Sequence, residues 1–153
     1  MTRWLALGAV VFAATATPAS AGVASCVIST TALAFGRYVP SRNAPVDFTA
    51  SLTVTCAATG DGSASVDGTI SLVGAAEGRE LADGPHRLRY QLFADPARTI
   101  PWGDGGNAKA VSGLVGPTTP LRAHFTIYGR ILARQRQAQV GHYTDQITAM
   151  LNY

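Results

Sequence analysis

The amino-acid sequence predicts an all-β protein, an immunoglobulin-like β-sandwich. Two patterns favour this fold class. Short runs alternate between apolar and polar side chains, and Gly, Pro, Asp and Asn separate them, as between the strands of a sandwich. No apolar stripe with helical spacing extends beyond about two turns. We therefore expect about six short strands in two packed sheets.

The N-terminus has the composition of a signal peptide. Arg3 precedes a short apolar stretch, residues 4–14, and Ala19-Ser20-Ala21 supplies the small side chains that a signal peptidase accepts. The apolar stretch is well short of the roughly 20 residues of a membrane-spanning helix, and no later run approaches that length. We expect cleavage after Ala21, export, and one domain over residues 22–153.

The clearest strand is residues 48–56, where Phe48, Ala50, Leu52, Val54 and Cys56 alternate with polar side chains. The same period of two predicts strands, some of them weaker, at residues 26–29, 33–35, 66–73, 87–93, 121–127 and 143–153. Turn-forming segments separate them at residues 59–62, 82–85 and 102–107. Because no alternating run follows Tyr153, we expect a sandwich that lacks its last strand and exposes unpaired backbone.

Cys26 and Cys56 are the only two cysteines, and an exported protein meets an oxidising compartment. Neither belongs to a paired Cys-x-x-Cys motif with the ligand spacing of zinc. We predict one disulfide between the first two strands, which would stabilise the fold by roughly 3 to 4 kcal/mol.

Charge and motifs exclude several classes of function. The chain has 12 basic and 9 acidic side chains, and this small excess of positive charge is too mild for a nucleic-acid-binding protein. The basic side chains are also scattered along the sequence. Hydrolase and phosphate-binding motifs are missing, and His86, His124 and His142 have no ligand spacing. We expect no enzyme activity, no cofactor and no metal.

Aromatic and acidic residues leave alternatives open. Trp102 with Tyr90 and Phe93 either packs in the core or forms a sugar-stacking surface, as in a free-standing secreted carbohydrate-binding module. Asp104 lies in a glycine-rich turn and is expected to bond its own backbone. Asp145 is expected either half-exposed or paired with a partner such as Arg130.

A series of short motifs in a fixed order resembles the spore coat protein U domain family, whose members include subunits of archaic chaperone-usher pili. The resemblance spans nearly all of residues 22–153. It depends on Cys26, Leu33 to Tyr38, Leu52 to Cys56, Leu88 to Phe93 with Asp95, the Trp102-Gly103-Asp104-Gly105 and Gly129-Arg130 turns, and Gly141 with Tyr143 and Asp145.

The resemblance implies a non-catalytic structural and adhesive subunit of a surface pilus, biofilm fibre or coat. Its partners would be a periplasmic chaperone, an outer-membrane usher and neighbouring subunits, each chaperone or neighbour inserting a β-strand. That strand would pair along residues 147–153 and fill a groove formed by Phe125, Ile127, Ile147, Ala149, Leu151 and Tyr153.

The chain departs from the polymerising members of this family, which carry an N-terminal donor extension. Only Gly22 to Ser25 would precede Cys26 after cleavage. This suggests a subunit that accepts a strand without donating one, at the tip or the end of a fibre.

Overall fold

The structure, a computed structural model, describes residues 22–32, 35, 38–41, 43–75, 77–103 and 107–153. These residues form eight strands and no helix. The predicted signal peptide, residues 1–21, lies outside the described residues. The strands are β1 (Val23–Thr30), β2 (Val46–Thr59), β3 (Ala64–Leu72), β4 (Arg79–Asp83), β5 (His86–Phe93), β6 (Lys109–Val115), β7 (Leu121–Ile131) and β8 (Ala149–Asn152).

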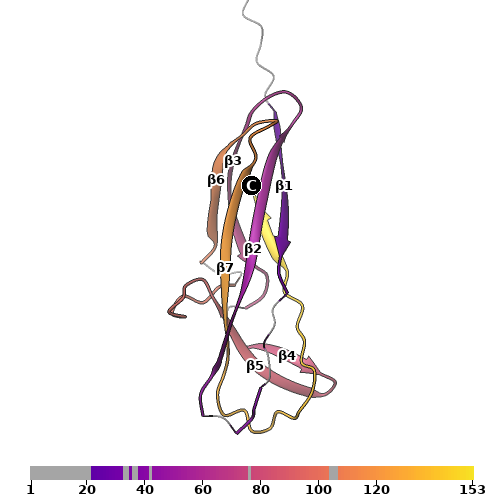
Figure 1. Ribbon diagram of the computed structural model, residues 1–153, viewed down its shortest axis with the longest axis vertical. Coiled ribbons are helices and arrows are strands. Elements are labelled where there is room, and N and C mark those ends of the chain that lie inside the picture. Colours follow the sequence, from indigo (N-terminus) through magenta and orange to yellow (C-terminus); the bar gives the residue numbers. More distant parts are fainter. Residues whose placement is uncertain (1–21, 33–34, 36–37, 42, 76, 104–106) are drawn as a thin grey trace, which may run out of the picture.

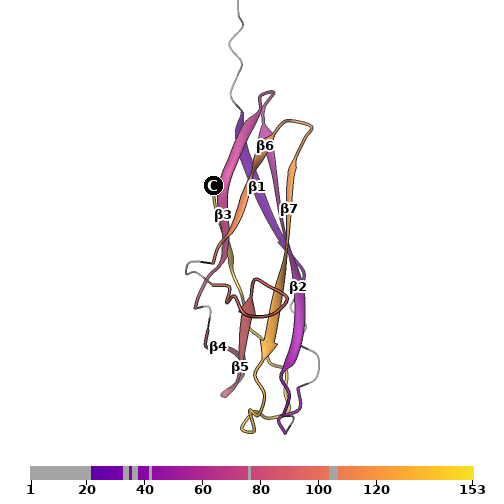
Figure 2. The same cartoon turned by 90° about the vertical axis from the view of Figure 1, so that its left-hand side faces the viewer.

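The strands form two antiparallel sheets, which confirms the all-β prediction. One sheet has five strands in the order β1-β2-β7-β5-β4, and the other has three in the order β6-β3-β8. Figures 1 and 2 show an elongated molecule in which β2 and β7 run along much of its length. β1 begins near one end of the molecule, and β4 and β5 lie at the opposite end (Figure 1).

The neighbours of the two long strands, β2 and β7, differ between the two halves of the molecule. β2 and β7 pair over eleven residues, from Val46 opposite Ile131 to Cys56 opposite Leu121. β1 pairs only with the second part of β2, and β5 only with the last part of β7. β1 and the three-stranded sheet lie in one half, and β4 and β5 lie in the other (Figures 1 and 2).

Alternation along the strands builds a single core. The inward positions of β2 are Phe48, Ala50, Leu52, Val54 and Cys56, all nearly or completely buried. They meet the inward residues of the other sheet and of β5, including Val66, Ile70, Leu72, Val111, Leu88, Tyr90 and Leu92. Trp102 has no exposed surface and fills the space beside Phe125, edge to face at a centroid distance of 6.2 Å.

The strand predictions are confirmed at β2, β5 and β7, where alternation is strong, and also at β1 and β3, where the signal is weaker. The sequence did not indicate β4 and β6. β4 buries only Leu81, and in β6 the inward Gly113 and the exposed Leu114 break the alternation. Part of the predicted strand 33–35 lies outside the described residues.

The predicted terminal strand, residues 143–153, is wrong in extent. Only Ala149–Asn152 pair as a strand, with β3. The preceding segment is irregular and touches a strand at one point, where Thr144 exchanges backbone hydrogen bonds with Ala82 of β4 (2.8 and 3.0 Å). Tyr143 and Ile147 are half-buried against the core although they belong to no strand.

The predicted disulfide is present between Cys26 and Cys56. The two residues are directly opposite each other on β1 and β2, so the bridge joins neighbouring strands of one sheet. Because β1 is an edge strand held by β2 alone, the disulfide fixes both its attachment and its register.

We predict that replacing both cysteines by alanine lowers the free energy of unfolding by about 3 kcal/mol, since the closed loop spans 30 residues. Thermal unfolding with and without dithiothreitol measures the effect. Reductant should destabilise the wild type and leave the double variant unchanged. Equal stability of oxidised and reduced wild-type protein would contradict this prediction.

Candidate functional site

The backbone edges of β1 and β8 are both open within the part of the chain that the structure describes. The Thr31 N–H donates to Ser51 O (2.9 Å), so odd-numbered residues of β1 bond β2, and Ala24, Cys26, Ile28 and Thr30 direct their N–H and C=O groups away from it. Apart from the Cys26 N–H, which donates to the Tyr153 hydroxyl, these groups have no strand partner among the described residues, and such an edge can accept another strand.

The same reasoning applies to β8. The Val73 N–H donates to Thr148 O (2.7 Å), which makes Met150 and Asn152 the hydrogen-bonded partners of β3. Ala149 and Leu151 therefore direct their backbone polar groups away from β3. Two open edges from different sheets thus border one side of the sandwich.

A hollow of about 310 Å³ lies between these edges. We call it the edge groove. Its rim is the end of β1 and the segment before β8, and its floor is the nearly fully buried side chains of Leu52, Leu72 and Ile127. The residues around it are Thr30, Thr31, Ala32, Leu52, Leu72, Ile127, Asp145, Gln146, Ile147 and Ala149. A mainly apolar floor open at its side can accept apolar side chains.

Three of the six predicted groove residues, Ile127, Ile147 and Ala149, line the edge groove. Phe125 instead packs on Trp102, and Leu151 is half-buried opposite Ile70 of β3. Thr30, Thr31, Ala32 and the β2 residue Leu52 were not anticipated. The first three lie just after the apolar residues of β1, and no period of two marks them.

Tyr153 bridges the two open edges. Its side chain is 58% exposed, and its hydroxyl accepts a hydrogen bond from the Cys26 N–H at 3.3 Å. Cys26 is one of the β1 residues whose N–H points away from β2. The Tyr153 hydroxyl therefore occupies a position where a strand added to β1 would place a carbonyl oxygen.

Asp145 lies at the edge groove and is held by Tyr90. The buried Tyr90 hydroxyl donates to Asp145 Oδ2, and the Gln146 N–H donates to Oδ1 at 2.8 Å. The proposed pairing of Asp145 with Arg130 is wrong, because Arg130 binds Asp47 instead. Burial and the Asp145 carboxylate both raise the pKa of Tyr90, since both disfavour the phenolate.

Arg130 and Asp47 form a bidentate pair across β7 and β2. The two guanidinium–carboxylate distances are 2.7 and 2.9 Å, and Arg98 approaches the same carboxylate at 3.5 Å. The hydrogen bonds from Arg130 lower the pKa of Asp47. Gly129 and Arg130 were expected in a turn, and this is wrong because both lie within β7.

Gly129 is required by the ring of Phe48, its partner on β2. A Cβ atom built at Gly129 would lie 1.7 Å from the ring, far inside van der Waals contact. Because Gly129 has no side chain, the Phe48 ring can pack in the core at this position. Trp102 and Gly103 are also buried, while Asp104 and Gly105 lie outside the described residues.

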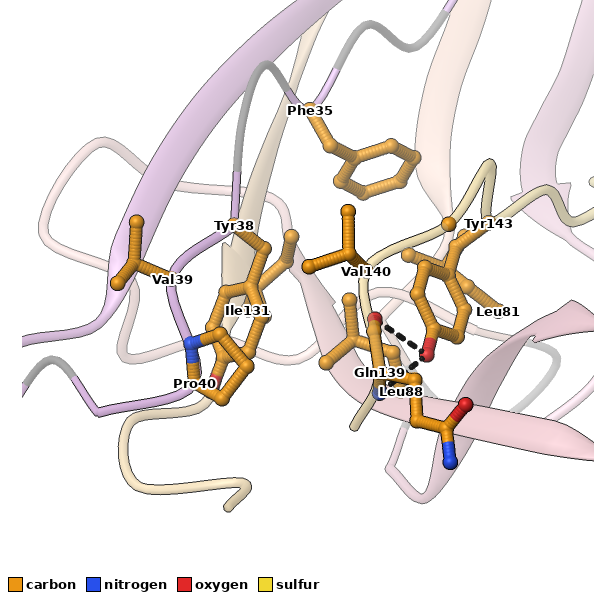
Figure 3. Close-up of a pocket in the computed structure, with 11 residues that line it drawn as sticks. Phe35, Tyr38, Val39, Pro40, Leu81, Leu88, Ile131, Gln139, Val140 and Tyr143 are labelled. Carbon is orange, nitrogen blue, oxygen red and sulfur yellow. Dashed lines mark hydrogen bonds between the residues drawn. The ribbon is translucent and has the colours of Figure 1, made fainter. Parts of the chain in front are cut away.

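A second hollow of about 190 Å³, the loop pocket, lies between β4–β5, the residues Phe35 and 38–40, and the loop 139–143 (Figure 3). Tyr143 closes one side, where its hydroxyl donates to Gln139 O (2.9 Å) and accepts from Gln139 N (3.0 Å). Gly141 lies on the same loop, and a Cβ atom built on it would clash with the Asp83 carboxylate. Phe35 packs edge to face on Phe48 and Tyr90, so these loops are tied to the core.

No arrangement of side chains for catalysis or metal binding emerges from the described residues. No group of three or more His, Cys, Asp or Glu side chains is close enough to hold a metal ion there. Nor does any helix in this part of the chain have the length and apolarity needed to cross a membrane. The open edges and the hollow between them are therefore the candidate site.

Comparison with known protein families shows which family the sequence matches. Residues 10–150 match the family described as Spore Coat Protein U domain, and this range covers most of the chain, including part of the predicted signal peptide. A search of curated proteins gave no match.

We predict that Tyr90→Phe changes the alkaline stability of the protein. The pKa of Tyr90 is raised on folding, so its contribution to stability is present below about pH 10 and is lost as the pH rises above that value. Between pH 9 and 11 the wild type should lose about 1.4 kcal/mol more than the variant. Denaturant unfolding across this range measures the difference. Tyr153→Phe, which alters an exposed tyrosine, should decline as the wild type does; the same decline in Tyr90→Phe would refute the assignment.

We predict that Gly129→Ala destabilises the fold by about 2 kcal/mol, because the new methyl group overpacks the site against Phe48. The control is the same substitution in a Phe48→Leu background. There the added cost should fall below about 0.5 kcal/mol if the ring is the cause. Equal costs in the two backgrounds, measured by urea unfolding, would assign the effect to the backbone instead.

Proposed function

Because this chain belongs to the Spore Coat Protein U domain family, we propose that it is a strand-accepting subunit of a surface pilus or coat. The family is structural and non-catalytic. The observation that carries the proposal is the pair of open strand edges beside an apolar hollow. A strand from another protein would lie along β8, between it and β1, and place alternate side chains in the edge groove.

The register of the open edges supports this mode of binding. Ala149 and Leu151 of β8 direct backbone polar groups toward the incoming strand, as do Cys26 and Ile28 of β1 on the far side. The added strand would join the two sheets and complete an immunoglobulin-like sandwich. The Tyr153 hydroxyl would leave the Cys26 N–H, which would then bond the new strand.

The partners of such a subunit are those that the resemblance to the family implies. A periplasmic chaperone would supply the strand first, and a neighbouring subunit would replace it after passage through an outer-membrane usher. The proposed signal peptide, residues 1–21, would take the chain across the inner membrane, and the disulfide fits an oxidising compartment. The protein would then reside at the cell surface. The position at a fibre end stays a prediction.

The alternative of a sugar-stacking module lacks support from the aromatic residues. Trp102 and Tyr90 have no exposed surface, and Phe93 is 7% exposed. A buried ring cannot stack on a sugar. These three residues therefore do not form the sugar-stacking surface that the sequence had left open as an alternative.

We predict that residues 22–153 form a stable one-to-one complex with the cognate periplasmic chaperone and give little soluble protein without it. The unpaired edges would otherwise pair between molecules and cause aggregation. Periplasmic co-expression followed by size-exclusion chromatography measures both quantities. A soluble monomer that does not bind the chaperone would refute strand acceptance.

A matched pair of β8 variants tests the location of the strand. Ala149→Phe fills the edge groove, whereas Met150→Phe enlarges a side chain that is 48% exposed on the other face of β8. We expect Ala149→Phe to weaken chaperone binding at least about tenfold, because overpacking costs 1 to 3 kcal/mol. Met150→Phe should bind as the wild type does. Equal effects would place the inserted strand elsewhere.

A further inference from the structure

Four arginines gather around a shallow hollow at the end of the molecule that carries β4 and β5 (Figure 1). Arg87 and Arg89 extend from the exposed face of β5, and Arg134 and Arg136 come from the loop after β7. We call this the arginine surface. The hollow has a volume of about 470 Å³, and its residues are Glu80, Arg87, Arg89, Arg134, Gln135, Arg136, Gln137 and Ala138.

The loop that carries Arg134 and Arg136 is fixed to β5 by Gln135. Its side-chain amide accepts from Arg89 N (2.6 Å) and donates to Arg89 O (2.8 Å), as a neighbouring strand would. The Gln135 N–H also donates to the Tyr38 hydroxyl at 3.1 Å. The four arginines therefore come from a strand and from a loop that is anchored to that strand.

Arg134 has a left-handed backbone, with a φ of 61°. For a residue other than glycine this conformation costs on the order of 1 kcal/mol or more. The next turn is closed by hydrogen bonds from Arg136 N to Arg134 O (2.9 Å) and from Ala138 N to Gln135 O (3.0 Å). The left-handed turn and these hydrogen bonds fix the backbone of the loop beside the hollow.

The positive charge of this surface is largely unneutralised. Glu80 is the acidic residue of the described lining, and it approaches Arg89 at 3.6 Å in an exposed pair, which water screens strongly. Arg87 donates only to the carbonyl oxygens of Gly84 and His86 among the described residues. Neither Arg134 nor Arg136 has a carboxylate partner within the same described part of the chain.

From this arrangement we infer that the arginine surface is a binding site for an acidic polysaccharide that carries carboxylate or sulfate groups. Guanidinium groups bind such oxyanions with paired hydrogen bonds. The exposed Gln137 amide adds a donor and an acceptor suited to sugar hydroxyls. Arg87 and Arg89, two residues apart on one face of β5, would contact successive charges about 7 Å apart.

The lining favours a polysaccharide over the other polyanions. Among the described residues no aromatic ring lines the hollow, so they offer no platform on which the bases of a single-stranded nucleic acid could stack. The apolar part of this described lining is the methyl group of Ala138, which offers no pocket for the anchor residues of an acidic peptide. The site also lies at a different end from the start of β1, and it does not depend on strand acceptance.

The test measures binding of the exported protein, purified with its chaperone where it needs one, to immobilised polysaccharides by biolayer interferometry. The probes are polygalacturonate for carboxylate, dextran sulfate for sulfate, unmodified dextran as the neutral control, and a single-stranded DNA oligomer. We expect saturable binding to one or both acidic polysaccharides that weakens as salt rises, and none to dextran.

The variant pair is Arg134→Gly with Arg136→Gln, against Lys109→Ala with Arg122→Ala. Each double variant removes two positive charges, the first from the arginine surface and the second from β6 and β7. Glycine suits the left-handed backbone at position 134, so the first variant should stay folded, which its thermal unfolding checks. We expect about a tenfold loss of affinity in the first variant and less than twofold in the second.

Three results would overturn the proposal. The first is no binding to either acidic polysaccharide. The second is an equal loss in both double variants, which would assign binding to net charge alone. The third is tighter binding of the DNA oligomer than of both polysaccharides at the same salt concentration, which would identify a nucleic-acid site instead.

Discussion

The pairing of β2 with β7 is the interaction on which the rest of the structure depends. Eleven consecutive residue pairs join strands that are 62 or more positions apart in the chain. In the five-stranded sheet β1 attaches to β2, β5 attaches to β7, and β4 attaches through β5. Phe48 and Gly129 are partners in this ladder, as are Asp47 and Arg130. Gly129 and Arg130, which the sequence placed in a turn, thus stabilise the central ladder. Gly129 makes room for the Phe48 ring, and Arg130 forms an ion pair with Asp47.

The strength of each strand signal in the sequence follows how much of the strand is buried. β2 has five inward apolar residues in phase, and the prediction of residues 48–56 covers the buried part of its 14 residues, whereas β4 buries Leu81 alone and was missed. The same limit applies to the site. Ile127, Ile147 and Ala149 could be named from their phase, but Thr30, Thr31 and Ala32 reach the edge groove only because β1 ends beside it. Phase also misplaced Asp145, because the segment before β8 is irregular and brings its carboxylate to Tyr90.

The two ends of the molecule differ in the functions they can support. The half containing β1 and β8 has open backbone edges beside a mainly apolar hollow, which is suited to pairing with another strand. The half containing β4 and β5 is closed by loops that hydrogen bonds from Tyr38, Gln135 and Tyr143 hold in place, and it carries exposed arginines. Strand acceptance and polysaccharide binding, as proposed above, would therefore use different residues of one subunit.

The disulfide has a mechanical consequence for a subunit held in a fibre. The covalent bond between Cys26 and Cys56 closes a loop of 30 residues that begins near the start of the first strand. If tension enters through β1, the force passes from Cys26 to Cys56 and bypasses the residues between them. About 100 Å of chain is thereby withheld from extension. A pulled subunit would yield only beyond the bridge, so an oxidised fibre should be shorter under load than a reduced one.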